Sequence, residues 1–299
     1  MIKLSVVTPS FNQAKYLRAT LESIHSQQYP NLEHWVIDGG STDGSLEILE
    51  EYRRAGLLNY ISEPDRGQSD AINKGFARIS GEVVCWLNSD DLYNPGTLLS
   101  VSKFFEDNPD KQLLTGDCNF IDAEGRHLTV FVGSRVSRES LIRVTSLNVQ
   151  PATFFRRTLL DKVQGLNSSL HYALDYDFWL RMTRHVAFEY RPQTFASARM
   201  HLECKSMRPN HETFLPEVVR CSRQHFGPVY LPAYWLRFLY LSRHCSKVYY
   251  EAALTAKREG HSKQFLQFLL RAVGYAPWKI LYWKDLLSAI LKPTDLSSR

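Results

Sequence analysis

The sequence predicts an α/β fold with a mostly parallel central sheet and helices on both faces, followed by a helical C-terminal region. Three observations carry this prediction. Over residues 1–90, four apolar runs alternate with amphipathic runs, as is typical of βαβ units. Each apolar run ends in a cluster of polar residues. Beyond Pro209 the chain becomes rich in Leu, Tyr, Trp and Arg and shows no clear strand pattern.

The elements of the first part follow from hydrophobic periodicity. The expected strands are residues 4–8, 33–38, 58–62 and 82–87, and the expected helices between them are 14–28, 43–56 and 68–80. In the first helix, Leu17, Leu21 and Ile24 recur on one face. In the second, Asp43 can cap the start and Gly56 can end the last turn.

The second part is less regular. Residues 113–122 and 126–132 are typical of two strands joined by a Gly-containing turn, and 153–166 and 175–185 are typical of helices. The change of texture after Pro209 predicts a soft domain boundary, with one domain over 1–210 and a helical region over 211–299.

Composition indicates an ordered globular protein. Hydrophobic residues make up 44% of the 299 residues and charged residues 22%, which argues against disorder. The five cysteines form no CxxC pair, so we expect reduced thiols in a cytoplasmic protein and no zinc site. We expect neither a signal peptide nor a transmembrane helix, because no apolar run is long enough.

Charge is distributed unevenly. The net charge is +5, but residues 212–299 carry 13 Lys and Arg against 6 Asp and Glu. The runs 230–250 and 265–291 also mix Leu and aromatic residues with these cations. Two interpretations stay open: the helices pack on the first domain or on a second protomer, or they lie on the inner face of the cell membrane.

The four polar clusters point to one ligand site. They are 9–12, 39–43, 63–67 and 88–91, and ligands of open α/β sheets bind beyond the carboxyl ends of strands. The chain has no GxGxxG after its first strand and no GxxxxGK[ST]. Asn88, Asp90 and Asp91 instead carry oxygens of the kind that Mg²⁺ or Mn²⁺ prefers. The alternative is that Ser89 or Asp90 only caps the next helix, with Pro95 in its first turn.

Five motifs in order resemble glycosyltransferase family 2. They are VVTPSFNQ (6–13), VIDGGSTDGS (36–45), SEPDRGQSDAINKG (62–75), WLNSDD (86–91) and LDYDFWLR (174–181). The resemblance covers about residues 3–206. It implies the GT-A fold, a Rossmann-like nucleotide-binding architecture, and inverting transfer from a nucleotide-sugar donor, with UDP as the expected carrier.

The resemblance also implies roles for single residues. Those at the nucleotide sugar would be Thr8, Pro9, Phe11, Asp38, Asp65, Arg66, Asp70, Asn88 and Asp90. Divalent Mn²⁺ or Mg²⁺ would be held by Asp90, Asp91 and His201. Asp175 would be the catalytic base that takes the proton of the acceptor hydroxyl. Gln150, Pro151 and Asp177 would border the acceptor.

Two positions depart from the family pattern, and structural alternatives stand beside several roles. Asn88 and Leu174 occupy positions where many members have Asp and Glu. Asp38 could instead cap its own turn through Ser41 or Thr42, and Asp177 could pair with Arg181 one helical turn later.

The expected function is metal-assisted transfer of a sugar to a glycan or lipid-linked hydroxyl, as in polysaccharide biosynthesis at the cell envelope. We expect no nucleic-acid partner, and homo-oligomers fit the packing interpretation of the tail. The alternatives are a non-catalytic scaffold that binds nucleotide sugar or glycan, and a metal-dependent phosphohydrolase. The second needs an aspartate nucleophile after the first strand, where Thr8, Pro9 and Ser10 stand instead.

Overall fold

The computed structural model describes residues 1–143 and 149–201 without a break, together with shorter stretches beyond them. These stretches are 204–205, 217–218, 220–221, 224–225, 246–247, 249–251, 253–258, 260 and 262–291. The chain divides into two compact units. The first comprises Met1–Ile142 and Ser146–His225, and the second comprises Arg143–Thr145 and Phe226–Arg299.

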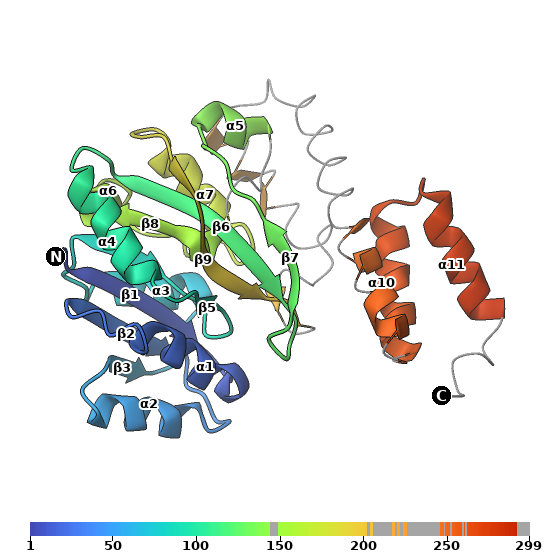
Figure 1. Cartoon of the computed structure of the whole chain (residues 1–299), viewed down its shortest axis with the longest axis horizontal. Helices are drawn as coiled ribbons and strands as arrows, with labels where there is room; N and C mark the ends of the chain where they lie inside the picture. The colour runs from blue at the N-terminus through green and yellow to red at the C-terminus, as the bar shows by residue number, and fades with distance from the viewer. Residues whose placement is uncertain are drawn as a thin grey trace. The chain divides into compact units, whose positions relative to one another are not determined.

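The first unit is a nine-stranded sheet with helices (Figure 1). Its strands are β1 (Leu4–Ser10), β2 (Leu32–Asp38), β3 (Asn59–Ser62), β4 (Val83–Trp86), β5 (Leu92–Tyr93), β6 (Leu113–Ile121), β7 (His127–Phe131), β8 (Thr153–Arg156) and β9 (Glu189–Arg199). Its helices are α1 (Ala14–His25), α2 (Ser45–Arg54), α3 (Gln68–Phe76), α4 (Thr97–Asp107), α5 (Arg138–Arg143), α6 (Arg157–Val163) and α7 (Leu174–Met182), with a 3₁₀ turn η1 (Gln150–Ala152).

The first four expected strands form the parallel half of the sheet, as predicted. The order runs β3-β2-β1-β4, and every pair in it is parallel. Ser10 is in register with Asp38, and Asp38 is in register with Ser62. The carboxyl ends of these four strands therefore lie at one edge, where the four polar clusters begin.

The second half of the sheet is mixed. Beyond β4 the order continues β8-β6-β9-β5, with β7 paired to β6. The expected hairpin is confirmed by the antiparallel pairing of β6 and β7. The helix expected over 153–166 is wrong at its start, because Thr153–Arg156 forms β8 between β4 and β6. Phe154 and Phe155 are fully buried there, and such a doubly covered strand shows no alternation in sequence.

Side chains on the two faces of β1 meet different helices. Val6 packs in a cluster with Ile24 of α1 and Phe104 of α4. Its neighbour Val7 faces α3, where Gly75 leaves room for it. Alternate residues of a strand point to opposite faces, so the predicted two-sided covering of the sheet is confirmed in this part of the chain.

An aromatic cluster fixes α7 on the sheet. Trp86 at the end of β4 stacks on Trp179 with ring centroids 5.5 Å apart. Phe155 of β8 meets Phe178 edge-on at 5.5 Å. Aromatic rings bury large apolar areas and prefer such offset or edge contacts. The helix that carries Asp175 is thus held by the same strand that leads into Asn88–Asp91.

The described part of the second unit is helical, as expected. It contains α10 (Ser262–Tyr275) and α11 (Ile280–Leu291). Tyr250 stacks on Tyr282 of α11 at 4.3 Å and donates its hydroxyl to Asp285 Oδ2 at 2.5 Å. No helix among the described residues is long and apolar enough to cross a membrane. Most of the run 230–250 lies outside the described residues, and the two interpretations of the tail stay predictions.

Candidate functional site

Asp38 fastens the ends of the parallel strands. Its carboxylate is fully buried. Oδ2 accepts hydrogen bonds from Gly40 N (3.0 Å), Ser41 N (2.9 Å) and Ser62 Oγ (2.7 Å), and Oδ1 accepts one from Ser41 Oγ (2.5 Å). Asp38 therefore caps its own turn through Ser41, the alternative role that the sequence suggested. These bonds connect the loop after β2 to the end of β3 and build one wall of the site.

Gly39 lies close to both the first and the third loop. Phe11 is 58% exposed. A Cβ atom on Gly39 would lie 2.7 Å from Asp65 Oδ2 and 3.2 Å from Phe11 Cδ2. Asp65 Oδ1 accepts a hydrogen bond from Gly67 N at 2.7 Å, which fixes its loop. An exposed ring and a carboxylate thus face each other across a glycine.

The other residues expected at the nucleotide sugar lie in two environments. Thr8 and Pro9 are buried in β1, and Thr8 Oγ1 lies 3.0 Å from His34 Nε2. Arg66 lies at the surface with its side chain 81% exposed, and its Nη2 lies 3.1 Å from Asp70 Oδ1. Thr8 therefore contacts the interior, whereas Arg66 and Asp70 form an exposed pair at the start of α3.

Asp90 and His201 come together from distant parts of the chain. His201 Nε2 lies 2.9 Å from Asp90 Oδ2. The Asp90 side chain is 17% exposed and that of His201 4% exposed. The His201 ring also lies against Tyr16 of α1, with centroids 4.8 Å apart. The pair offers a carboxylate oxygen and an imidazole side by side.

Asp91 points inward. It is 5% exposed, and it accepts hydrogen bonds from Arg199 N at Oδ1 (2.9 Å) and from Asn88 Nδ2 at Oδ2 (3.1 Å). Burial raises the pKa of Asp91 well above its usual value, and the neighbouring Asp90 raises it further. The two adjacent carboxylates therefore differ: Asp90 is turned to His201, and Asp91 anchors the loop.

The structure gives Asn88 a role that an aspartate could not fill. Its Nδ2 donates to Asp91 Oδ2 (3.1 Å) and to Gln150 Oε1 (3.3 Å), and its Oδ1 accepts from Gln68 Nε2 (2.7 Å). Gln150 in turn donates to Trp86 O at 2.6 Å. A carboxylate at position 88 has no donor for Asp91 and would add a like charge beside it. Gln150 and the adjacent Pro151 are buried behind the acidic loop.

Arg199 at the end of β9 locks this loop in place. Its Nε donates to Asp90 O at 2.9 Å, and its Nη1 donates to Asp122 O (3.2 Å) and Ala123 O (3.1 Å). The guanidinium lies over the Tyr16 ring, 5.0 Å from the centroid. Together with the Arg199 N–H on Asp91, these contacts set the position of both carboxylates and of His201 two residues later.

Asp175 lies in the first turn of α7. Its side chain is partly buried, and Oδ1 accepts a hydrogen bond from Tyr176 N at 2.7 Å. Burial raises the pKa of Asp175, and the Lys205 cation opposes that rise. Lys205 Nζ donates to Gln68 Oε1 and to His171 O, both at 2.9 Å. Lys205 and Gln68 therefore form a polar chain from the neighbourhood of Asp175 to Asn88.

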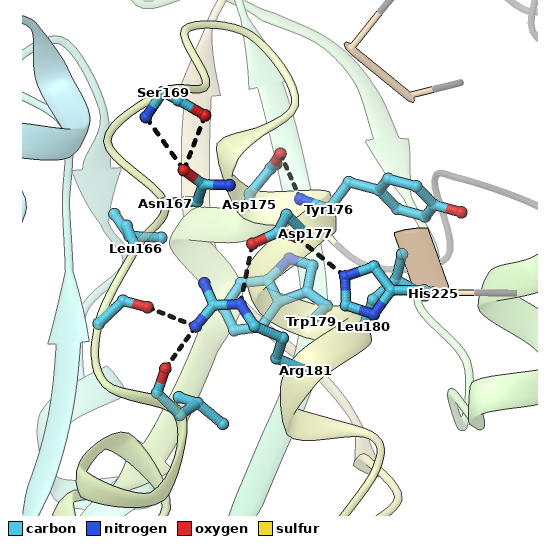
Figure 2. A network of polar contacts seen from close by, with 12 residues as sticks. Leu166, Asn167, Ser169, Asp175, Tyr176, Asp177, Trp179, Leu180, Arg181 and His225 are labelled. Carbon is cyan, nitrogen blue, oxygen red and sulfur yellow. Dashed lines mark hydrogen bonds and ion pairs between the residues drawn. The ribbon is translucent and has the colours of Figure 1, made fainter. Parts of the chain in front are cut away.

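Asp177 serves another purpose. Figure 2 shows its carboxylate between Arg181 and His225. Arg181 Nε lies 2.8 Å from Oδ2, and His225 Nε2 lies 3.0 Å from Oδ1. The predicted pairing with Arg181 is confirmed. Burial favours a higher pKa for Asp177, but the bond to His225 and the charge of Arg181 outweigh it and lower the pKa. Leu174 is buried in the core.

The protein offers few side chains to a metal ion at this site, so most of the ion's ligands would be water and substrate phosphate oxygens. Among the described residues, no group of three or more His, Cys, Asp or Glu side chains is arranged to hold a metal ion. Of the three predicted ligands, the structure brings Asp90 and His201 together and holds Asp91 in hydrogen bonds. Mg²⁺-type sites commonly use one or two carboxylates and take further oxygens from water and substrate phosphates. Asp90 and His201 fit that arrangement.

Sequence reasoning missed four residues that build the site: Tyr16, Gln68, Arg199 and Lys205. The first two lie within expected helices, and nothing in the helical pattern separates them from solvated residues. The signal that could have found the others is the run ARMHLECK (198–205), which places two cationic side chains close to His201.

Comparison with known proteins identifies the architecture. Residues 5–163 match the family described as Glycosyl transferase family 2. An uncharacterized glycosyltransferase of Rickettsia typhi, RT0329, is 29% identical over 207 residues, which cover 66% of this chain and 64% of that protein. Chondroitin synthase of Escherichia coli is 27% identical over 208 residues, which cover 69% of this chain and 30% of that enzyme.

Two solved structures share the fold. TarS 1-349 of S. aureus, solved in complex with UDP-GlcNAc, has a TM-score of 0.62 at 22% identity, covering 92% of this chain and 82% of that one. The mannosyltransferase PcManGT of Pyrobaculum calidifontis, in complex with GDP-Man and Mn²⁺, has a TM-score of 0.57 at 18% identity, covering 97% and 86%. The expected GT-A fold is confirmed.

Proposed function

Because the chain belongs to glycosyl transferase family 2, we propose that it transfers a sugar from a nucleoside-diphosphate sugar to a hydroxyl group, with inversion and with Asp175 as the base. One observation carries the proposal. Asn88, Gln68 and Lys205 form a hydrogen-bonded chain that starts at Asp91, the neighbour of Asp90, and ends at a cation whose charge acts on Asp175. A site of this kind can hold the diphosphate at one end and activate an acceptor at the other.

The reaction is a single displacement. The acceptor oxygen forms a bond to the anomeric carbon while the bond from that carbon to the diphosphate oxygen breaks, and the diphosphate leaves with the electron pair. The hydroxyl proton passes to the carboxylate of Asp175. Burial raises the pKa of this group, which makes it a stronger base than an exposed aspartate. Lys205 places a cation between the two ends of the site.

Asp90 and His201 would hold a divalent cation, Mn²⁺ or Mg²⁺, with Asp91 supporting the loop from behind. When bound, such an ion neutralises the charge of the diphosphate. Arg199 and Asn88 give the two neighbouring carboxylates different roles, whether or not the ion is bound. Asp91 accepts their N–H groups, and Asp90 remains available to the ligand.

The donor half of the site supports a nucleotide. Phe11 offers an exposed ring for a base, and Asp65 faces it across Gly39. TarS was solved with UDP-GlcNAc and PcManGT with GDP-Man, and we favour UDP for this chain. The acceptor, a glycan or a lipid-linked hydroxyl, and a place at the inner face of the membrane belong to the same proposal. The alternative is a non-catalytic scaffold that binds nucleotide sugar.

Asp175→Asn separates transfer from binding. The amide keeps the shape of the side chain but cannot take the proton. We expect thermal stabilisation by UDP with Mn²⁺ to stay at the parent value, and release of UDP from a UDP-sugar substrate to fall by roughly 10²–10⁴-fold. Turnover equal to that of the parent would remove Asp175 from this role. Nucleotide binding without turnover in the parent would favour the scaffold.

A further inference from the structure

The start of α7 is held by a carboxylate from a distant part of the chain. Glu217 accepts the backbone N–H groups of His171 (2.9 Å to Oε1), Tyr172 (2.8 Å to Oε2) and Ala173 (2.8 Å to Oε2). Glu217 is half-buried and lies 44 residues beyond Ala173, which is the residue before the first helical position. No side chain at the N-cap position itself makes a capping bond.

The N–H group of Ala173, at the N-cap, is one of the donors that the start of a helix leaves without a partner inside the helix, and those of His171 and Tyr172 lie just ahead of it. A carboxylate is the strongest acceptor for them and also complements the positive end of the helix. Asp175 lies only two residues after Ala173 and is the nearest carboxylate in sequence. With Glu217 in place, three donors are already occupied, and Asp175 accepts from the helix only within its own turn, at Tyr176 N.

The segment that carries Glu217 is fastened at its other end as well. His225 Nε2 bonds Asp177 Oδ1 at 3.0 Å, as Figure 2 shows. Arg184 Nη2 lies 3.0 Å from His225 Nδ1, and Arg138 Nη2 donates to His225 O at 3.2 Å. Two contacts eight residues apart thus anchor the segment on the helix that carries Asp175. This makes Glu217 a fixed partner of that helix.

We propose that Glu217 is a positioning residue for Asp175. By occupying the N–H groups ahead of α7, it keeps the Asp175 carboxylate from turning back onto them and leaves that carboxylate directed to the acceptor. This inference rests on the proposed function, in which Asp175 is the base. Glu217 itself touches neither substrate nor the reacting atoms, and it acts through the backbone of 171–173.

The direct test measures the titration of Asp175 itself. In Glu217→Ala, the freed N–H groups become available to Asp175, and hydrogen bonds to the charged form lower a carboxyl pKa. Three charged side chains bear on this titration: Lys205, which stays in place, Asp177, which stays paired with Arg181 and His225, and Glu217, whose negative charge the substitution removes. Glu217→Gln removes the same charge but keeps an acceptor for the N–H groups. A carboxyl NMR titration should therefore show a lower pKa of Asp175 in Glu217→Ala than in Glu217→Gln, and equal values in the two variants would overturn the proposal.

Turnover provides the second arm, with UDP-GlcNAc and GDP-mannose as donors and release of the nucleoside diphosphate as the readout. We expect Glu217→Ala to lower kcat by about 10- to 100-fold, the effect of a small misplacement of a reacting group, and to leave KM for the donor within about 2-fold. Glu217→Gln should recover part of the loss, because its carbonyl oxygen still accepts N–H bonds. Glu51→Ala is the matched control, since Glu51 of α2 forms an exposed ion pair with Arg18 of α1.

The outcomes separate this inference from the function on which it rests. If Asp175→Asn abolishes turnover while Glu217→Ala keeps it at the level of Glu51→Ala, the positioning role is wrong and the base stands. If Asp175→Asn leaves turnover unchanged, Asp175 is not the base, and the positioning role falls with it. A melting temperature is measured for each variant. If Glu217→Ala does not fold, Glu217→Met, which keeps the length of the side chain but offers no oxygen acceptor, provides both readouts. A kcat and an Asp175 pKa equal to those of Glu217→Gln would then contradict the proposal.

Discussion

His201 Nε2 lies 2.9 Å from Asp90 Oδ2, although 111 residues separate the two in sequence. The Arg199 side chain, two residues before His201, donates to the backbone of Asp90, and its N–H donates to Asp91. Residues at the end of β9 therefore place His201 beside the acidic loop and also hold that loop through the hydrogen bonds of Arg199. This pairing joins the parallel half of the sheet to the mixed half at the site.

Replacing His201 should weaken metal binding more than it weakens the fold. Partners that only orient a metal-binding carboxylate typically contribute 10–100-fold to metal affinity. We therefore expect His201→Ala to raise the Mn²⁺ concentration needed for half-maximal stabilisation of the UDP complex by at least about 10-fold. His127→Ala on exposed β7 is the control. Equal Mn²⁺ titrations for the two variants would exclude His201 from the metal site.

Metal stabilisation should increase with pH. The pKa of Asp91 is raised in the folded protein and returns to about 4 on unfolding. Between these two values the folded state retains a proton that the unfolded state has lost, so the contribution of this group to stability falls as pH rises. A cation held by Asp90 and His201 would favour the charged form of the neighbouring Asp91, so binding of the cation is coupled to loss of that proton.

Thermal unfolding with and without Mn²⁺, measured in steps from about pH 5 to pH 7.5 in the presence of UDP, checks this prediction. The difference in melting temperature should widen towards pH 7.5. A difference in melting temperature that stays constant over this range would show that binding of the ion is not coupled to loss of the proton from Asp91.

Gly39→Ala should damage nucleotide binding more than stability. The new Cβ would lie 2.7 Å from Asp65 Oδ2 and 3.2 Å from the Phe11 ring, so one of these two partners must move. We expect the Kd for UDP to increase by about 10-fold, in line with the 1–3 kcal/mol typical of overpacked sites.

Isothermal titration of UDP measures that change. Gly274→Ala in α10 is the matched control, because a Cβ atom there meets no atom within 4 Å. Parent-like affinity in Gly39→Ala would show that the space between Phe11 and Asp65 does not receive the nucleotide.

The parallel half of the fold could be predicted because its signals are local. The apolar runs of β1 to β4 and the faces of Leu17, Leu21 and Ile24 can be read within single segments, and these three residues are buried as expected. β9 was missed because Pro192 interrupts it and because its pairing partner β6 lies more than 70 residues earlier, from Leu114 opposite Glu189 to Ile121 opposite Arg199. β8 was taken for helix because it runs directly into α6 at Arg157.

Some residues of the candidate site could be predicted from the sequence, and others could not. Resemblance to a family placed Asp90, His201 and Asp175 in one centre, whereas periodicity could not. The contacts of Asn88 with Gln68 and Gln150 span 20 and 62 residues, and the contact of Glu217 with the start of α7 spans 44. Bonds of this kind depend on how the chain closes in space, and a single sequence carries no signal for them.

We expect the edge of the sheet beside Asp90 and His201 to bind a nucleoside diphosphate together with a divalent cation. The most direct test is thermal unfolding of the full chain with UDP, GDP and dTDP, each with and without Mn²⁺. One nucleotide at about 100 times its dissociation constant should stabilise the protein by roughly 2.7 kcal/mol, and only with the metal present. No stabilisation by any of the three, with or without Mn²⁺, would contradict the claim.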